Sequence, residues 1–239
     1  MGRKKNLLVA GFGITVAGLF SMTTTAAEDW KSEVELGAVM TTGNTDEQNF
    51  KFRFDSIGDL ETVRHTAHVD TLKSSKDSNT TAQKAYLSYQ LDYKLEGDRS
   101  VFGRVAYEDD RFSGYDYQVD ATVGYSQLLF ENKTMKLTGD AGLGYRTSEL
   151  ETGGSEDEMI VRLAAKYLWQ VSENATFQQL LSAEIGSDST ISRSDTSLKT
   201  TIVGDLAMKL ALSVKHNSEV PAGRENTDTE TSVTLVYAF

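Results

Sequence analysis

Residues 85–94 read AYLSYQLDYK, and apolar side chains alternate with more polar ones along this stretch. One parity carries Ala85, Leu87, Tyr89, Leu91 and Tyr93, and the other carries Tyr86, Ser88, Gln90, Asp92 and Lys94. Successive side chains of an extended chain point to opposite faces. The alternation therefore predicts a β-strand with one apolar and one polar face.

The same period of two returns along the chain without a helical interval. It predicts twelve strands, at residues 32–40, 50–55, 63–70, 85–94, 101–108, 117–125, 135–145, 159–169, 177–185, 196–202, 206–214 and 231–239. The alternation is weakest at 196–202. The chain has a single proline, Pro221, so almost every backbone N–H remains able to donate to a neighbouring strand.

The connections between these strands alternate in length. Short ones lie near Gly58, Gly97, Asn132, Asn174 and Gly204, and longer ones lie at 42–47, 74–81, 109–114, 149–157, 187–193 and 217–226. Outer-membrane barrels have an even number of strands, short periplasmic turns and longer extracellular loops. Closure of the sheet also removes exposed strand edges. The pattern predicts an all-β fold, a single antiparallel transmembrane β-barrel of about twelve strands.

The N-terminal residues 1–27 have the order of an export signal. Basic residues at 3–5 precede an uncharged stretch at 7–22, and small residues follow at 23–27. The alternative is a membrane anchor, which needs roughly 20 mainly apolar residues. The stretch at 7–22 is shorter than that and is interrupted by Gly and Thr. We therefore expect a cleaved signal peptide, with 28–239 forming the barrel in a Gram-negative outer membrane.

Composition excludes several classes of function. The chain has 24 Lys and Arg against 35 Asp and Glu, a formal charge of -11, whereas nucleic-acid binding relies on basic side chains that neutralise phosphates. No nucleic-acid partner is expected. The absence of Cys excludes disulfides, thiol catalysis and thiolate metal sites.

Aromatic side chains on the apolar parity fall near the ends of the predicted strands, which indicates two girdles at the membrane interfaces. Those beside short connections are Phe54, Tyr93, Tyr125, Trp169, Phe177 and Phe239, and those beside long ones are Phe50, Tyr107, Tyr117 and Tyr145. The chain ends on Phe239. This ending resembles the C-terminal signal by which outer-membrane proteins engage the barrel assembly machinery, so Phe239 is the predicted contact with that machinery.

Three segments together resemble one known family. They are ELGAVMTTGNTD at 35–46, FGRVAYEDDRFSGYDY at 102–117, and the tail from 214 to 239. The chain is similar to the salt-induced outer-membrane protein family (YdiY-like) over essentially all of 28–239. The resemblance implies an outer-membrane barrel with a link to salt or osmotic conditions. It supplies no catalytic residue.

Charged residues of both signs fall on the polar parity, which faces the barrel interior. The basic ones are Lys31, Lys51, Arg53, Arg64, Lys94, Arg104, Lys136, Arg146, Arg162, Lys166, Lys199, Lys209 and Lys215; the acidic ones are Glu33, Glu35, Asp55, Asp70, Asp92, Glu108, Asp120, Asp140, Glu184, Asp195 and Glu230. Unpaired charge in a narrow interior is costly, so cross-strand ion pairs are expected. The pattern favours a mostly occluded lumen; the alternative is a narrow diffusion channel with a constriction of one sign.

The leading hypothesis for function is a non-enzymatic envelope protein, either structural or a narrow solute channel, without catalytic residues, cofactor or metal. The alternative is an outer-membrane hydrolase that uses His216 or His68, since His beside Ser or Asp drives hydrolysis. Adjacent residues on a strand point to opposite faces, so His216 and Asn217 do not converge. No Gly-x-Ser-x-Gly or His-Glu-x-x-His motif occurs.

The predicted outer loops are rich in carboxylates, at 108–110, 149–151, 156–158 and 219–230. They lack the regular spacing of a calcium loop and indicate a solvated acidic rim. With Arg111 and Arg224 beside them, these carboxylates predict contact with lipopolysaccharide phosphates through bridging cations. The expected partners are thus outer-membrane lipids and lipopolysaccharide, and the protein is expected to be a monomer.

Overall fold

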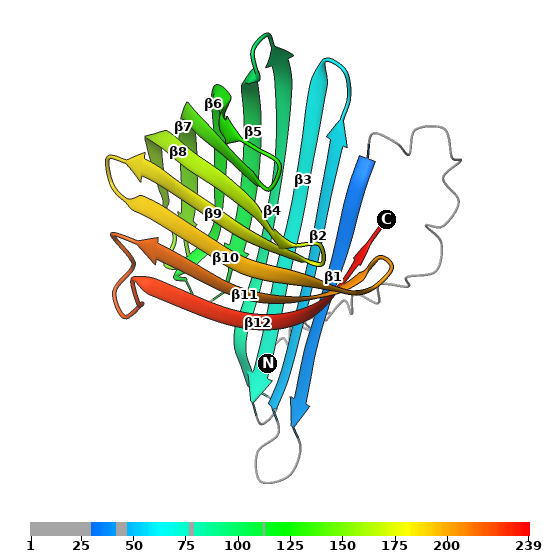
Figure 1. Ribbon diagram of the computed structural model, residues 1–239. Coiled ribbons are helices and arrows are strands. Elements are labelled where there is room, and N and C mark those ends of the chain that lie inside the picture. The colour runs from blue at the N-terminus through cyan, green and yellow to red at the C-terminus, as the bar shows by residue number, and fades with distance from the viewer. Residues whose placement is uncertain (1–29, 42–46, 77–78, 112) are drawn as a thin grey trace, which may run out of the picture.

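The computed structural model describes residues 30–41, 47–76, 79–111 and 113–239. The strands in these residues are β1 (Trp30–Thr41), β2 (Glu47–Asp59), β3 (Val63–Lys76), β4 (Asn79–Leu95), β5 (Arg99–Asp110), β6 (Tyr115–Glu131), β7 (Met135–Leu150), β8 (Ser155–Ser172), β9 (Ala175–Gly186), β10 (Thr190–Val203), β11 (Leu206–Asn217) and β12 (Thr227–Ala238). Each strand pairs antiparallel with the next, and β12 pairs with β1 (Figure 1). The predicted closed twelve-stranded barrel is confirmed.

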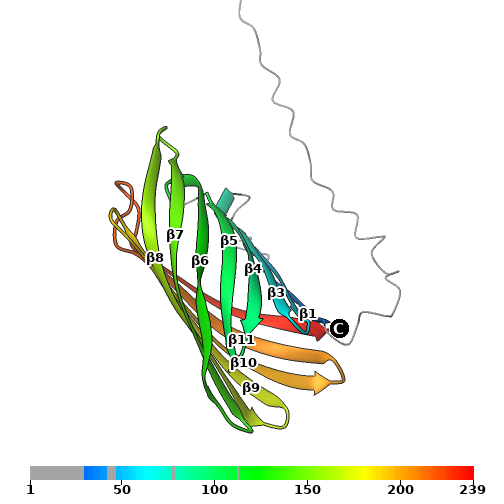
Figure 2. The same ribbon diagram turned by 90° about the horizontal axis from the view of Figure 1, so that it is seen from above.

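The barrel is flattened, with two walls that face each other. Strands β9–β12 cross β1–β5 steeply in Figure 1, and Figure 2 shows the same barrel from above. Side chains from the two walls meet inside: Arg193 on β10 reaches Glu108 on β5, with 2.7 Å between Nη2 and Oε2. The shape brings strands that are distant around the sheet into direct contact.

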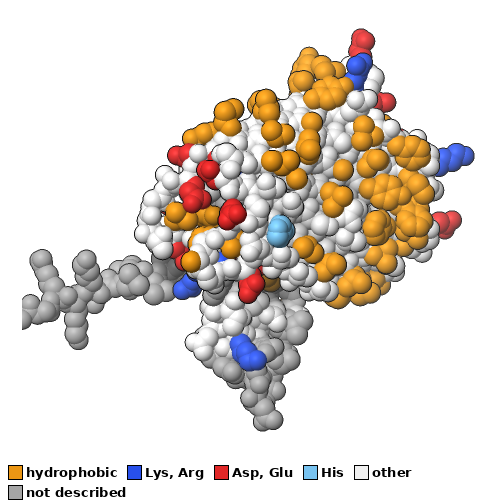
Figure 3. Space-filling model, turned by 90° about the vertical axis from the view of Figure 1, so that its left-hand side faces the viewer, with side chains coloured by type: hydrophobic (Ala, Val, Ile, Leu, Met, Phe, Trp, Pro, Cys, Tyr) orange, Lys and Arg blue, Asp and Glu red, His pale blue; other side chains and the backbone are white. Residues whose placement is uncertain are grey.

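Two neighbouring residues of β8 show which face meets lipid. Leu163 is 47% exposed on the outer surface, whereas Arg162 is 9% exposed and points inward. Hydrophobic side chains gather over the outer surface (Figure 3), while most buried residues are polar or charged. A soluble protein has the reverse distribution, and a membrane barrel has this one. The protein is an outer-membrane β-barrel of the Gram-negative type.

The aromatic side chains assigned to the two girdles lie on the outer face or at its edge. Tyr93 and Phe239 are well exposed near the short turns, and Phe50 and Tyr145 are equally so near the opposite end. The remaining members are half-buried or less exposed, namely Phe54, Tyr125, Trp169, Phe177, Tyr107 and Tyr117. Their placement fits amphipathic rings at the two interfaces of a bilayer.

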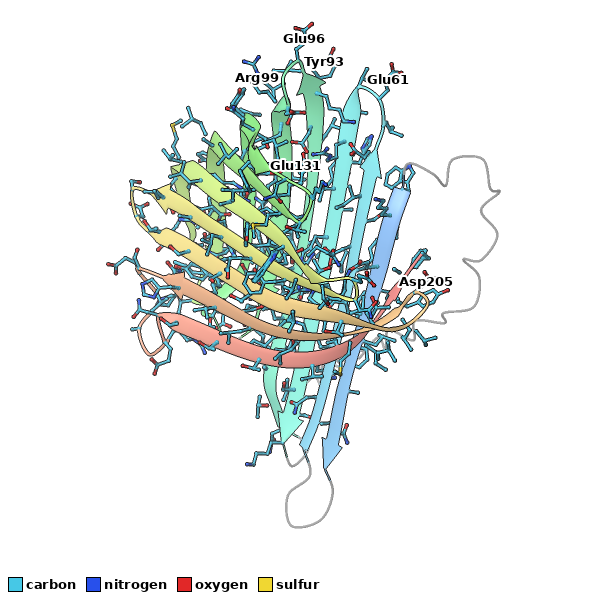
Figure 4. All side chains as sticks on the ribbon, in the orientation of Figure 1. Glu61, Tyr93, Glu96, Arg99, Glu131 and Asp205 are labelled. Carbon is cyan, nitrogen blue, oxygen red and sulfur yellow. The ribbon has the colours of Figure 1, made fainter. Side chains whose placement is uncertain are left out.

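The turns at one end of the barrel are short, as expected, at 60–62, 96–98, 132–134, 173–174 and 204–205. Charged side chains mark this end: Glu61, Glu96, Arg99, Glu131 and Asp205 lie at or beside these turns (Figure 4). Charge at the strand ends fits contact with water beyond the apolar belt.

The connections at the other end are mostly shorter than predicted. Strand β3 continues to Lys76 and β4 begins at Asn79, so the loop predicted at 74–81 is wrong in extent, as are those at 149–157 and 187–193. Backbone pairing satisfies N–H and C=O groups whatever the side chains, so the ladders continue past the point where apolar alternation fades. The connection at 218–226 is long, and most of 42–47 lies outside the described residues.

The barrel is closed by a short ladder between β1 and β12, which we call the seam. Four residue pairs form it, from Glu33–Ala238 to Leu36–Leu235. Two backbone hydrogen bonds between Ser32 and Phe239, each 2.9 Å, extend it by one step. The seam is much shorter than the neighbouring ladder between β1 and β2, which runs along the whole of β1.

The predicted signal peptide at 1–27 lies outside the described residues. Among the residues that are described, no helix has the length and apolar character to cross a membrane.

Candidate functional site

The interior near the long-loop end holds four arginines around one carboxylate, and we call this group the arginine cluster. It consists of Glu184 on β9 with Arg104 on β5, Arg146 on β7, Arg162 on β8 and Arg193 on β10. Glu184 Oε1 lies 3.6 Å from Arg162 Nη1 and 3.9 Å from Arg104 Nη1. Its Oε2 lies 3.0 Å from Arg193 Nη1 and 3.9 Å from Arg146 Nη1. Glu184 is 1% exposed, so these charges act on one another with little screening by water.

Three of the four arginines have a second carboxylate partner: Asp120 for Arg104, Glu158 for Arg146 and Glu108 for Arg193. Arg162 differs. Within the described residues Glu184 is the one carboxylate within ion-pair distance of it, and its Nε and Nη1 are buried without a hydrogen-bond partner. Arg146 Nη1 and Thr122 Oγ1 are also buried and unpartnered in the described structure. The arginine cluster therefore contains N–H groups that donate no hydrogen bond.

Glycines on β6 and β7 make room for side chains that point inward beside the cluster. Gly142 is directly opposite Arg162, and Gly124 is opposite both Gly142 and Phe102. A Cβ on Gly124 would lie 2.7 Å from Phe102 Cζ, and one on Gly142 would lie 2.9 Å from Thr122 Cγ2. A side chain at either position would displace these neighbours, so the inner wall requires glycine here.

Glu108 on β5 links the two walls of the barrel. Its carboxylate forms ion pairs with Lys84 Nζ at 3.2 Å, Lys215 Nζ at 2.8 Å and Arg193 Nη2 at 2.7 Å. These cations come from β4, β11 and β10, and Glu108 is 4% exposed. The resulting bridge fills the lumen between the walls.

A cavity of about 230 Å³ lies on the long-loop side of this bridge. Its lining includes Tyr115 and Gln118 on β6 and Lys215 on β11, under the connection at 218–226. The loops that surround it are tied together, because Arg224 Nη2 lies 2.8 Å from Glu151 Oε2. Lys215 belongs both to the cavity and to the Glu108 bridge, so the two are continuous.

The other half of the interior is also closed by ion pairs. On β2, Lys51 contacts Asp70 at 3.1 Å and Glu230 at 2.5 Å, and Arg53 contacts Asp70 at 2.6 Å. Lys199 pairs with Glu33 across the seam. The predicted cross-strand ion pairs between interior charges of both signs are confirmed in these residues.

Most of the interior charges lie where the sequence predicts them, but not all do. Lys31, Arg64 and Lys136 lie at strand ends, where Lys31 is exposed and the other two are of intermediate exposure. Lys84, Glu158 and Arg193 were missed, because two fell in predicted loops and Lys84 preceded a predicted strand. Their parity was the available signal, since Arg193 lies two positions before Asp195, which was assigned inward.

The histidines do not form the predicted hydrolytic arrangement at His216. His216 is exposed, with its Nδ1 2.8 Å from Thr227 Oγ1, while Asn217 is buried on the opposite face. His68 lies in the lumen with its Nδ1 2.6 Å from Asp55 Oδ1. In the strand register Ser88 is directly opposite His68 on its other side.

The acidic rim is smaller than predicted. Glu108 and Glu158 are 4% and 6% exposed and pair with interior cations instead of facing solvent. Glu151 does lie at the surface, paired with Arg224. The described part of the chain contains no group of three or more His, Asp or Glu residues placed to hold a metal ion.

Comparison with known proteins places the chain in a family. The model of the family described as "Protein of unknown function, DUF481" matches residues 34–239. An uncharacterized protein of Escherichia coli (strain K12), YdiY, is 26% identical over 167 residues, which cover 70% of this chain and 66% of that protein. The match thus spans just under two thirds of the relative's length.

Solved structures with a similar fold are outer-membrane barrels. A NanC porin has a TM-score of 0.53 at 13% identity, with 87% of this chain and 98% of that one covered. The COG4313 outer membrane channel of Pseudomonas putida F1 has a TM-score of 0.50 at 10% identity, with 88% and 95% covered. At these identities the likeness shows a shared fold.

Proposed function

This chain belongs to the family described as "Protein of unknown function, DUF481", and from its barrel we propose that it is a narrow, non-enzymatic solute channel of the outer membrane, closed in this conformation by interior ion pairs. The observation that carries the proposal is the Glu108 bridge. Its carboxylate holds Arg193 and Lys215 from the facing wall and Lys84 from its own wall, and so blocks the lumen beneath an open cavity.

The chemistry of the interior supports a channel over a purely structural barrel. Burying ion pairs is costly, and well-packed apolar residues of similar volume often stabilise a protein as well or better. A lumen of charged side chains can instead be rehydrated when the pairs separate, which gives water and ions a path. The similarity to a porin and to an outer-membrane channel supports the same proposal.

Single-channel recording in planar bilayers tests the proposal. The wild type is expected to pass a small current, and Glu108→Gln is expected to increase it, because Lys84, Lys215 and Arg193 lose their common partner and repel one another. Asp157→Asn, on the exposed start of β8, is the matched control and should leave the current unchanged. An absence of current in both the wild type and Glu108→Gln would contradict the channel.

The proposal also covers the oligomeric state, the contact with lipopolysaccharide and the link to salt. We expect a monomer whose loops contact lipopolysaccharide through Arg111 and bridging cations, since Arg111 is exposed at the long-loop end. The mass of the detergent complex, and the loss of lipopolysaccharide co-purification on chelation of divalent cations, check these two points. A link to salt is tested by immunoblot, with higher abundance expected in cells grown at raised osmolarity.

A hydrolase is the second candidate, and one observation favours it. Asp55, His68 and Ser88 stand in register on β2, β3 and β4, and the aspartate already contacts the histidine. That order of groups is the one used by serine hydrolases. Labelling of wild-type protein, but not Ser88→Ala, by a fluorophosphonate would establish this activity. Absence of labelling at Ser88 would leave the channel as the single proposal.

A further inference from the structure

Three of the four buried polar side-chain atoms that lack a hydrogen-bond partner in the described interior are guanidinium nitrogens, which donate and do not accept. In the described residues the four atoms are Arg162 Nε and Nη1, Arg146 Nη1 and Thr122 Oγ1. A buried donor without an acceptor costs free energy, and a buried guanidinium costs more. One nearby carboxylate already has several donors, because Glu158 accepts hydrogen bonds from Arg146, from Ser189 and from the backbone N–H of Asp188. The interior around Arg146 and Arg162 therefore has guanidinium N–H donors without a hydrogen-bond partner.

Arg162 is where this excess is concentrated. It stands directly opposite Glu184 in the ladder between β8 and β9, yet its Nη1 stays 3.6 Å from Oε1, longer than a hydrogen bond. Glu184 is shared with three other arginines, and the tightest of these contacts is with Arg193 at 3.0 Å. One carboxylate does not satisfy four guanidinium groups, and Arg162 is the one left over.

A chain of cations leads from the outside to this residue. Lys215 lines the cavity of about 230 Å³ under the outer loops, and it shares Glu108 with Arg193. Arg193 in turn shares Glu184 with Arg162. An anion that enters the cavity meets a cation at each step of this route, with an internal carboxylate between successive cations that it can replace.

From this arrangement we infer that the arginine cluster binds small solutes that carry carboxylate groups. The inference rests on the proposed channel and names its solute class. The solute's carboxylate takes the place that Glu184 half fills and pairs with Arg162, whose planar N–H fork matches two carboxylate oxygens. The binding is by exchange: as the solute arrives, the Glu184 carboxylate moves away from Arg162 and keeps its hydrogen bond to Arg193.

Arg162→Gln is the variant that tests the site. It removes the guanidinium whose Nε and Nη1 lack hydrogen-bond partners and leaves a shorter, neutral polar side chain. Arg64→Gln is the matched control, because it makes the same change at a residue whose side chain is 39% exposed beside a short turn. Reversal potentials are measured across planar bilayers in a gradient of potassium acetate. The wild type and Arg64→Gln are expected to favour acetate over potassium, and Arg162→Gln is expected to lose that preference.

A binding measurement separates the site from the channel. Succinate is added to the folded protein in detergent and its dissociation constant is measured by calorimetry, with sodium chloride at equal ionic strength as the reference. Arg162→Gln is expected to raise the dissociation constant about tenfold or more, as for the loss of one charged hydrogen-bonding partner. Arg162→Lys keeps the charge without the fork and is expected to fall between the two.

The outcomes differ for the two proposals. A current whose ion preference is the same in the wild type and in Arg162→Gln, together with equal succinate binding, would overturn the anion site and leave the channel. Succinate binding that depends on Arg162 without any current would support the site and overturn the channel. If Arg162→Gln does not fold, Arg162→Lys decides, and wild-type affinity for succinate in that variant would count against the fork.

Discussion

Lys209 on β11 reaches across β12 to Glu35 on β1, and 2.5 Å separates Nζ from Oε1. Glu35 is 2% exposed and Lys209 is 6% exposed. Thr234, on the strand between them, donates to the other carboxylate oxygen at 3.2 Å. These side-chain contacts thus join β11, β12 and β1 at the short seam between β1 and β12.

Breaking this tie should loosen closure of the barrel. Glu35→Gln leaves the buried ammonium of Lys209 without its partner, at a cost of roughly 3–5 kcal/mol. Urea unfolding in lipid vesicles and heat-modifiable gel mobility measure the loss. The double variant Glu35→Leu with Lys209→Leu removes both charges and should lose less than the single change. Equal losses in the two variants would show that the pair is not responsible for closure.

The two faces of β8 should respond differently to the same substitution. Leu163→Arg moves a guanidinium into the hydrocarbon region, at a cost of roughly 2–4 kcal/mol near the midplane. Ala164→Arg places it inside, opposite Asp140, and should cost less apart from crowding. Vesicle unfolding compares them, with Leu163→Ala and Ala164→Leu as size controls. A larger loss for Ala164→Arg would contradict the assigned faces.

The orientation in the membrane can be tested with inserted tags. Gly153 lies between β7 and β8 at the long-loop end, and Gly97 lies in the short turn between β4 and β5. Both are exposed glycines with positive φ, so both positions tolerate insertion comparably. An epitope at Gly153 should be labelled on intact cells, and one at Gly97 should be labelled after permeabilisation. Equal labelling of intact cells would refute the orientation.

A substitution at Phe239 should affect assembly of the barrel in the outer membrane more than its stability. Its backbone pairs with Ser32 at the seam, but the residue is 60% exposed and its ring stacks on Tyr237 with 6.2 Å between centroids. Phe239→Ala keeps the backbone bonds and removes the side chain predicted to meet the assembly machinery. Outer-membrane levels should fall, with more chain left in the periplasm, while unfolding of the purified barrel changes little. Unchanged abundance would remove the predicted signal.

The sequence was sufficient to predict strand number, order and the inward or outward face of most residues. Alternation reports burial on one face, and closure follows once the strand count is even and the connections alternate. The sequence did not predict the strand ends that extend beyond the lipid, because apolar and polar residues no longer alternate there. Arg193 and Glu158 occupy such extensions, so they were assigned to loops although their backbones pair like the rest.

The candidate site shows a second limit. Parity indicates that Arg162 and Glu184 face inward, and the structure confirms it. The approach of the two walls decides which arginine lacks a second carboxylate within ion-pair distance. Glu108, for example, reaches Arg193 although their strands are five apart around the sheet. A pattern along one strand carries no information about that approach. Phe102 illustrates the same point: it is apolar on the inward parity and fits there because Gly124 faces it.

The short seam also determines the order in which the barrel is completed. Every other ladder joins strands that follow each other in the chain, so it forms as a hairpin with a small entropic cost of loop closure. The seam joins the two ends, and Glu35 and Lys209 are 174 residues apart. Contacts at such separation form late, after the local ones have shortened the effective loop. The Lys209–Glu35 pair therefore forms at the last step of folding, when an open curved sheet with two free edges becomes a closed barrel.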